Sequence, residues 1–133
     1  MTETVLEARG LSKRFGGLVA VQDMSLSVAR GEILGLIGPN GAGKTTMFDL
    51  LAGSVRPSAG AIRLQGKDVT SLPPHRRLAA GMGRTFQIPR PFRKLSILEN
   101  ATVAAYFGAS QPLTSAQARE NAREALELIG LPS

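Results

Sequence analysis

The chain has 133 residues, enough for one domain that buries a substantial part of its surface. Apolar residues make up 43% of it, which is ordinary for a packed globular protein and too high for a disordered one. There is no cysteine, so a disulfide scaffold and thiolate metal sites are excluded. No apolar run approaches the roughly 18 residues of a membrane span. The segment of residues 1–10 has acids where a secretory signal peptide needs bases followed by an apolar stretch. These features predict a soluble cytoplasmic domain.

The formal net charge is +6, and its uneven placement is more informative than its sum. Between Asp68 and Glu99 the chain has no acid, but it carries His75 and the cations Arg76, Arg77, Arg84, Arg90, Arg93 and Lys94. Such a segment can meet nucleic acid, anionic lipid or a phosphate-bearing ligand. It can equally be a solvated face, because charge runs usually lie at the surface.

The first half of the chain predicts short strands, a glycine-rich loop and a helix. Alternating runs at residues 5–9, 18–21 and 25–28 predict antiparallel strands with one wet face. Residues 33–37 are continuously apolar and predict a strand buried on both faces. After glycine-rich residues 38–43, residues 44–52 predict a helix that ends at Gly53. Residues 61–64 then predict a hairpin strand with Gln65 and Gly66 at its tip.

The second half predicts mainly helices. Pro73 and Pro74 can open a short helix that runs to Ala80, and residues 82–86 are compatible with another strand. Pro89 and Pro91 predict an irregular loop. Capping-box spacing starts one helix at residues 96–99, reaching about residue 106, and another at residues 114–117, ending at residue 130. The apolar face of the last helix is predicted to hold Ala118, Ala122, Ala125, Leu126 and Ile129.

Residues 38–45, which we call the phosphate loop, read Gly-Pro-Asn-Gly-Ala-Gly-Lys-Thr and fit the pattern G-x-x-x-x-G-K-[ST] in full. Glycines let successive backbone N–H groups point at one anion, and the following helix aims its positive end at the same point. Lys44 supplies a charge for the β- and γ-phosphates, and Thr45 offers a hydroxyl to Mg²⁺. An apolar run before the loop and a helix after it are the context that the motif requires.

The phosphate loop, residues 14–17 (Arg-Phe-Gly-Gly) and residues 84–87 (Arg-Thr-Phe-Gln) together resemble the ATP-binding subunits of ATP-binding-cassette (ABC) transporters. Residues 90–92 and 95–100 are most similar to the cassettes of branched-chain amino acid importers, and the likeness runs from about residue 5 to the C-terminus. The resemblance implies an α/β P-loop NTPase fold with an antiparallel β subdomain, an incomplete central sheet and the start of a helical subdomain. It places the N-terminal part of the ATP-binding core in residues 1–87. Residues 88–133 would then hold the loop after Gln87 and the beginning of the helical subdomain.

Residue by residue, the resemblance implies part of a nucleotide site. Phe15 matches the aromatic residue that stacks on adenine, although a phenylalanine at a strand end is more often buried in a core. Gln87 matches the glutamine that contacts Mg²⁺ and the attacking water. Lys44 and Gln87 are thus the catalytic candidates, and Thr45 and Gln87 are the candidate Mg²⁺ ligands. The implied nucleotide contacts are Phe15, Gly38, Pro39, Asn40, Gly41, Ala42, Gly43, Lys44, Thr45 and Thr46.

The same resemblance implies cofactors, partners and a location. ATP and Mg²⁺ would be bound, and a second cassette subunit would complete a homodimer or heterodimer. Transmembrane permease subunits would dock near residues 87–94, and the protein would lie peripherally on the cytoplasmic face of the inner membrane. The implied function is the coupling of ATP binding and hydrolysis to solute uptake, with branched-chain amino acids as the solute.

The chain also departs from the family pattern, which keeps other functions open. It has no Leu-Ser-Gly-Gly-Gln-like signature, no apolar strand ending in Asp-Glu and no switch histidine, since His75 precedes Gln87 and is expected at the surface. We therefore expect little ATP hydrolysis by this chain alone, as for the front portion of a longer cassette or the product of a truncated gene.

The alternative function is a nucleotide-binding module without turnover. DNA binding by residues 69–98 has only charge in its favour, so no nucleic-acid partner is expected. A guanine-specific enzyme would need an Asn-Lys-x-Asp segment, which is absent.

Overall fold

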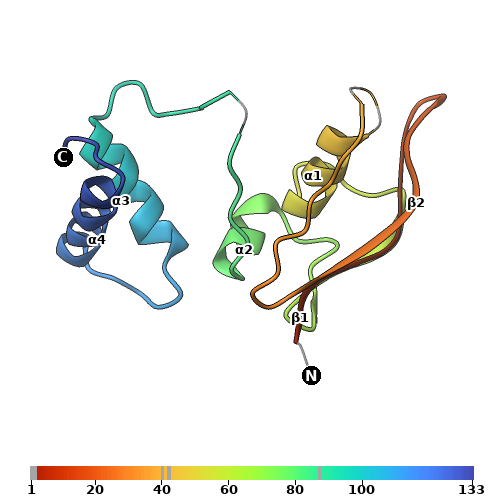
Figure 1. The fold of residues 1–133 in the computed structure, drawn as a ribbon, viewed down its shortest axis with the longest axis horizontal. Coiled ribbons are helices and arrows are strands. Elements are labelled where there is room, and N and C mark those ends of the chain that lie inside the picture. The colour runs from red at the N-terminus through yellow and green to blue at the C-terminus, as the bar shows by residue number, and fades with distance from the viewer. Residues whose placement is uncertain (1–2, 40, 42, 87) are drawn as a thin grey trace. The chain divides into compact units, whose positions relative to one another are not determined.

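The computed structural model describes residues 3–39, 41, 43–86 and 88–133. It divides into two compact units, Met1–Arg77 and Leu78–Ser133. Figure 1 shows that the strands and the first helix belong to the N-terminal unit and that the last two helices belong to the other. The functional division at residue 87 implied by the family resemblance remains a prediction.

The N-terminal unit is built on one antiparallel sheet in the order β2-β1-β3-β4. β1 (Thr4–Phe15) and β2 (Leu18–Ala29) form a long hairpin that turns at Gly16 and Gly17, and β3 (Ala59–Leu64) pairs with the other edge of β1. The short β4 (Lys67–Asp68) follows a two-residue turn in which Gln65 has φ 50° and Gly66 has φ 80°. The predicted antiparallel strands and the hairpin tip are thus confirmed.

The strands are longer than the sequence pattern predicts. Residues 18–21 and 25–28 were expected as two strands, yet they form one continuous β2. Asp23 lies between them with a positive φ of 47°, and the register against β1 shifts on both sides of the Leu11–Met24 pair. A bulge of this kind absorbs a break in the apolar alternation without ending the strand.

Helix α1 (Lys44–Ala52) follows the phosphate loop and contacts β2. It buries Met47, Leu50 and Leu51, while the sheet contributes the buried Ala8, Leu11, Val21, Ile62 and Leu64. Gly53 ends the helix in the left-handed region at φ 88°, as predicted. Helix α2 (Pro74–Ala79) begins at Pro74, one residue after the first predicted proline.

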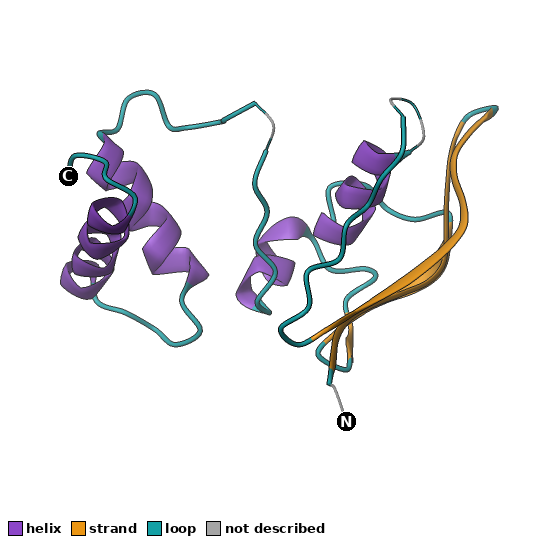
Figure 2. Ribbon diagram, in the orientation of Figure 1, coloured by secondary structure: helices purple, strands orange, loops and turns teal. Residues whose placement is uncertain are grey.

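Two predicted strands are wrong in this structure. Residues 33–37 and 82–86 have no regular secondary structure, as the loop trace before α1 in Figure 2 shows. Ile33 and Ile37 are 98% and 96% exposed, although the run was expected to be buried on both faces. An apolar run becomes a buried strand only when neighbouring strands take up its backbone hydrogen bonds. Among the described strands, β1 to β4 pair only with one another.

The C-terminal unit is a helical hairpin. α3 (Ile97–Gly108) and α4 (Ser115–Leu128) both begin with the predicted capping boxes, Ser96 with Glu99 and Thr114 with Gln117. They pack through Leu98, Ala122 and Leu126. The predicted apolar face of α4 is too wide, because Ala125 is exposed and Ile129 is 67% exposed. None of the described helices is long and apolar enough to cross a membrane.

Candidate nucleotide site

The phosphate loop leads into α1 through a glycine that no other residue can replace without strain. Gly43 occupies the N-cap position with φ 90°, and its carbonyl accepts the N–H of Met47 at 2.8 Å. A Cβ built on Gly43 would lie 2.5 Å from the carbonyl oxygen of Ala20 on β2. The start of α1 is therefore pressed against the β2 backbone, which fixes where the positive end of the helix points.

Lys44 turns back over the loop that precedes it. Its half-buried ammonium donates a hydrogen bond to the carbonyl of Gly38 at the other end of the loop. Thr45 is exposed to solvent, and Thr46 is half-buried. The loop thus brings one ammonium group and one exposed threonine to the N-terminus of α1.

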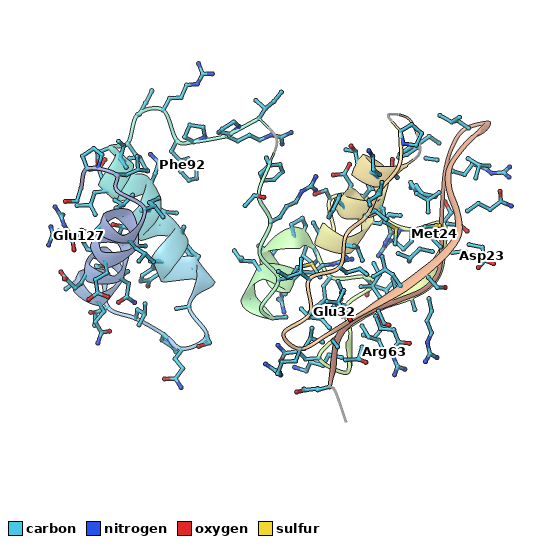
Figure 3. All side chains as sticks on the ribbon, viewed as in Figure 1. Asp23, Met24, Glu32, Arg63, Phe92 and Glu127 are labelled. Atoms are coloured by element: carbon cyan, nitrogen blue, oxygen red, sulfur yellow. The ribbon has the colours of Figure 1, made fainter. Side chains whose placement is uncertain are left out.

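A hollow of about 290 Å³ lies between the loop and the start of β2. Five predicted site residues line it, joined by three residues that the sequence did not point to; the lining is Leu18, Val19, Ala20, Gly41, Gly43, Lys44, Thr45 and Thr46. A second hollow of about 160 Å³ on the same helix start is lined by Gln22, Lys44 and mainly apolar residues, including Met24, which Figure 3 labels on β2. Only the first hollow combines the loop with Thr45 and Thr46.

Phe15 ends β1 next to the hairpin turn and is 46% exposed. The alternative of a core phenylalanine is therefore wrong, because nearly half of the residue faces solvent. The ammonium of Lys13 lies 5.1 Å from the centroid of the ring. The ring does not line the 290 Å³ hollow itself, although Leu18, its partner across the hairpin, does.

The remaining predicted site residues either do not line the 290 Å³ hollow or lie outside the described residues. Gly38 is half-buried and meets Lys44, and Pro39 is exposed. Asn40, Ala42 and Gln87 lie outside the described residues. Beside Gln87 in sequence, the guanidinium groups of Arg84 and Arg90 each lie 4.8 Å from the ring centroid of Phe86. Exposed Phe92 follows on the same segment, and His75 is exposed as predicted.

Arg77 is the residue that the sequence analysis missed. As part of a basic run it was expected to meet an anion or solvent, but it is only 2% exposed. Its guanidinium donates to the carbonyls of Leu50 and Leu51, at 2.6 and 2.8 Å, in the last turn of α1. Burial lowers the pKa of Arg77. The available signal was indirect: the last turn of α1 has no basic residue of its own to meet its free carbonyls.

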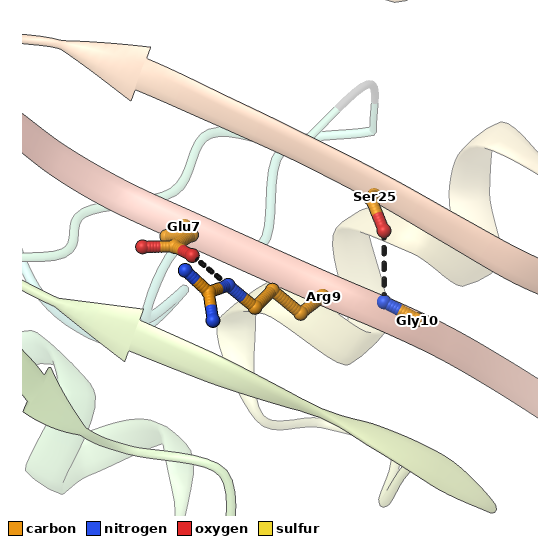
Figure 4. Close-up of polar contacts among 4 residues, drawn as sticks. All are labelled: Glu7, Arg9, Gly10 and Ser25. Atoms are coloured by element: carbon orange, nitrogen blue, oxygen red, sulfur yellow. Dashed lines mark hydrogen bonds and ion pairs between the residues drawn. The ribbon is translucent and has the colours of Figure 1, made fainter.

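Another hollow, of about 630 Å³, lies on the face of the β1–β2 hairpin. Figure 4 shows polar contacts in this part of the hairpin: Arg9 pairs with Glu7, and the N–H of Gly10, which does not line the hollow, donates to the hydroxyl of Ser25 at 2.9 Å. These groups satisfy one another, and none of them belongs to a sequence motif. The 290 Å³ hollow is thus the candidate site, because there the motif and the geometry coincide.

Three curated relatives illustrate what the chain is similar to. A high-affinity branched-chain amino acid transport ATP-binding protein of Pseudomonas aeruginosa is 45% identical over 78% of this chain and 41% of its own length. A protein of the same description from Escherichia coli K12 is 44% identical over the same shares. The lipopolysaccharide export system ATP-binding protein of Acidithiobacillus ferridurans is 48% identical over 72% of this chain and 40% of its own. The chain thus spans about two fifths of the length of these relatives.

Solved structures of ATP-binding cassettes have the same fold as this chain. A nucleotide-free ATP-binding cassette of an ABC transporter matches 96% of this chain and 55% of its own length at 30% identity, with a TM-score of 0.79. An ATP-binding cassette in its ADP conformation matches 98% of this chain and 55% of its own at 30% identity, with a TM-score of 0.80. The predicted fold class is confirmed. The family model described as "ABC transporter" matches residues 21–133, and the chain therefore belongs to the ABC transporter family.

Proposed function

We propose that this chain binds Mg·ATP at the phosphate loop, as part of the ATP-binding subunit of an importer for branched-chain amino acids. The observation that carries the proposal is the 290 Å³ hollow that Gly41, Gly43, Lys44, Thr45 and Thr46 line at the N-terminus of α1. Helix N-termini attract phosphates because their free N–H groups and their dipole act together.

Each group around the hollow has a chemical task in this proposal. The backbone N–H groups of the phosphate loop, of which Pro39 has none, would hold the phosphates, and the Thr45 hydroxyl would be one ligand of Mg²⁺. Lys44 would exchange the neutral carbonyl of Gly38 for an anionic phosphate oxygen, and hydrogen bonds to ionised acceptors are the stronger kind. Phe15 would stack on adenine, and Gln87 would meet Mg²⁺ and the attacking water.

The wider function follows from the relatives. Two relatives named for branched-chain amino acid transport are 45% and 44% identical over 78% of this chain, and the lipopolysaccharide export protein is 48% identical over a shorter 72%. The longer matches support branched-chain amino acids as the solute. We infer a second cassette subunit as partner, permease subunits docking at residues 87–94, and a peripheral position on the cytoplasmic face of the membrane. The exposed rings of Phe86 and Phe92 among arginines suit such an interface.

The alternative is nucleotide binding without turnover. The two functions differ in phosphate release from saturating Mg·ATP. A release rate that rises with protein concentration and disappears with Lys44→Ala supports hydrolysis. Release at the background rate in the presence of measurable ATP binding supports the binding module.

Replacing Lys44 by alanine tests the proposed site. We expect Mg·ATP to bind about 10- to 100-fold more weakly to Lys44→Ala, because a hydrogen bond between charged groups contributes roughly 1.5–3 kcal/mol. Lys67→Ala is the matched control, since Lys67 is an exposed lysine on β4. Isothermal titration of both variants and the wild type measures the effect. Equal affinity of the wild type and Lys44→Ala for Mg·ATP would show that the loop is not the site.

Replacing Phe15 by alanine tests the base contact separately. Stacking on an aromatic ring contributes roughly 1–3 kcal/mol per base and tolerates any base. Phe15→Ala should therefore weaken ATP and GTP binding alike and leave inorganic triphosphate binding unchanged. Competition titrations with the three ligands measure this, and Phe92→Ala serves as a control on another exposed phenylalanine. A wild-type protein for which GTP does not compete with ATP would rule out the stacking role.

A further inference from the structure

The side chain of Arg77 is the one buried charged group found among the described residues, and it has an unusual set of partners. Besides Leu50 and Leu51 in α1, its guanidinium donates to the carbonyl of Leu72 at 2.9 Å and to the carbonyl of Thr70 at 2.9 Å. All four acceptors are backbone carbonyls. The guanidinium therefore joins the end of α1 to residues 70–72, which lie on the other side of β3 in sequence.

A charge buried in this way needs a compensating charge nearby. The acceptors supply it, because the free carbonyls at a helix C-terminus carry about half a negative charge. Two of the four acceptors, Leu50 and Leu51, are carbonyls of this last turn, and that of Leu50 also accepts the N–H of Gly53 at 3.3 Å. Arg77 thus satisfies the C-terminus of α1 in a place where water cannot reach it.

The hydrogen bonds of Arg77 form a bridge from the last turn of α1 to residues 70–72, and this bridge is anchored in the sheet. The N–H of Ile62 on β3 donates to the hydroxyl of Thr70 at 2.9 Å, and the N–H of Thr70 donates to Asp68 at 2.9 Å. Ile62 is fully buried at the centre of β3. A continuous set of hydrogen bonds therefore leads from the sheet through Thr70 and Arg77 to the last turn of α1.

α1 has only nine residues, and its first residue is Lys44. A helix this short moves as a rigid unit, so a shift at its C-terminus also moves Lys44 and the amides of the phosphate loop. We propose that Arg77 is a positioning residue for phosphate binding: it fixes α1 along its axis and thereby places the phosphate loop. The proposal depends on the proposed function only for the ligand, since the bridge itself is a feature of the fold.

Lysine cannot replace the arginine here, because a single ammonium group cannot reach four carbonyls that a planar fork spans. The site is also closely packed. A Cβ on Gly53 would lie 2.8 Å from Nε of Arg77 and 3.0 Å from the carbonyl oxygen of Leu72. Gly53→Ala should therefore displace the guanidinium while Arg77 stays in the sequence.

The test compares Arg77→Met, Arg77→Lys and Gly53→Ala with Arg76→Met, a control on the exposed neighbour in α2. Binding of inorganic triphosphate and of Mg·ATP is titrated at a temperature at which circular dichroism shows each variant to be folded. We expect Arg77→Met to bind both ligands about tenfold more weakly, because small displacements of binding groups have large effects. Arg77→Lys and Gly53→Ala should fall between it and the wild type, and Arg76→Met should match the wild type. If Arg77→Met does not fold, the triphosphate affinities of Arg77→Lys and Gly53→Ala decide whether Arg77 positions the phosphate loop.

A second readout separates positioning from a general loss of stability. The amide of Met47, which is bonded to Gly43 in the first turn of α1, should exchange hydrogen about tenfold faster in Arg77→Met, while the amides of β1 exchange at the wild-type rate. Equal acceleration at both places, or unchanged triphosphate affinity in the folded variants, would overturn the positioning role. Wild-type binding that depends on Lys44 but not on Arg77 rejects this inference alone. A wild type that binds no nucleotide rejects the proposed function, and the exchange measurement then still decides the role of Arg77.

Discussion

Gly43→Ala is expected to abolish nucleotide binding, with an affinity for Mg·ATP at least about 100-fold below that of the wild type. The new Cβ would lie 2.5 Å from the carbonyl oxygen of Ala20, a backbone atom that cannot turn aside as a side chain would. In addition, Gly43 has φ 90°, a conformation that alanine adopts only with strain. Either β2 or the start of α1 must move, and both line the 290 Å³ hollow. Titration calorimetry with Mg·ATP measures the loss.

Gly41→Ala separates backbone strain from the steric clash of a new Cβ with a neighbouring strand, because both glycines lie in the phosphate loop. Gly41 has a similar φ of 87°, but a Cβ there would meet nothing within 4 Å. It should therefore lower the affinity less than Gly43→Ala does, because only the backbone strain of about 1–3 kcal/mol applies. If the two variants lose affinity equally, contact between Gly43 and β2 is not what places the loop. If Gly43→Ala binds like the wild type, the start of α1 does not lie against β2 at the nucleotide site.

Gly60→Ala is expected to produce the largest loss of folding stability, about 3–4 kcal/mol. Gly60 has φ 98° in β3, and a Cβ there would lie 2.6 Å from the carbonyl oxygen of Arg9 and 2.5 Å from that of Gly10. The close approach occurs where the register between β1 and β3 shifts, between the Arg9–Ala61 and Ser12–Ala59 pairs. A small domain has only about 5–15 kcal/mol of stability in total, so the sheet would be seriously weakened.

Urea unfolding followed by circular dichroism measures the Gly60→Ala effect, and Gly66→Ala is its matched control. Gly66 also has a positive φ, 80°, but open space surrounds its Cβ position. Its substitution should lower the free energy of unfolding by only about 1–2 kcal/mol, the strain of the backbone alone. Similar losses for both variants would mean that β1 and β3 do not approach each other closely at Gly60.

The parts of this fold that the sequence predicted well are those fixed by neighbouring residues. The capping boxes at Ser96 and Thr114 depend on side chains three residues away. The left-handed glycine at the end of α1 and the turn at Gln65 and Gly66 are equally local. The start of α1 at Lys44 belongs to this group, because it directly follows the glycine-rich residues.

The features that could not be predicted depend on residues far away in the chain. Residues 33–37 have the composition of a buried strand, but composition does not provide a pairing partner, and Ile33 and Ile37 remain exposed. Arg77 looks like any other member of a basic run until the carbonyls of Leu50 and Leu51 are placed beside it. The joining of two short predicted strands into β2 likewise depends on β1, which pairs along its whole length.

The proposed function requires that the backbone N–H groups of the phosphate loop surround a triphosphate at the N-terminus of α1. The most direct measurement is the set of amide ¹H–¹⁵N shifts of the full chain, titrated with Mg·ATP and, separately, with inorganic triphosphate. Both ligands should shift the amides of Gly41, Gly43, Lys44 and Thr45 most strongly, and Lys44→Ala should remove those shifts at the same ligand concentrations. Shifts confined to other parts of the chain, with these four amides unmoved at saturation, would contradict triphosphate binding at the phosphate loop.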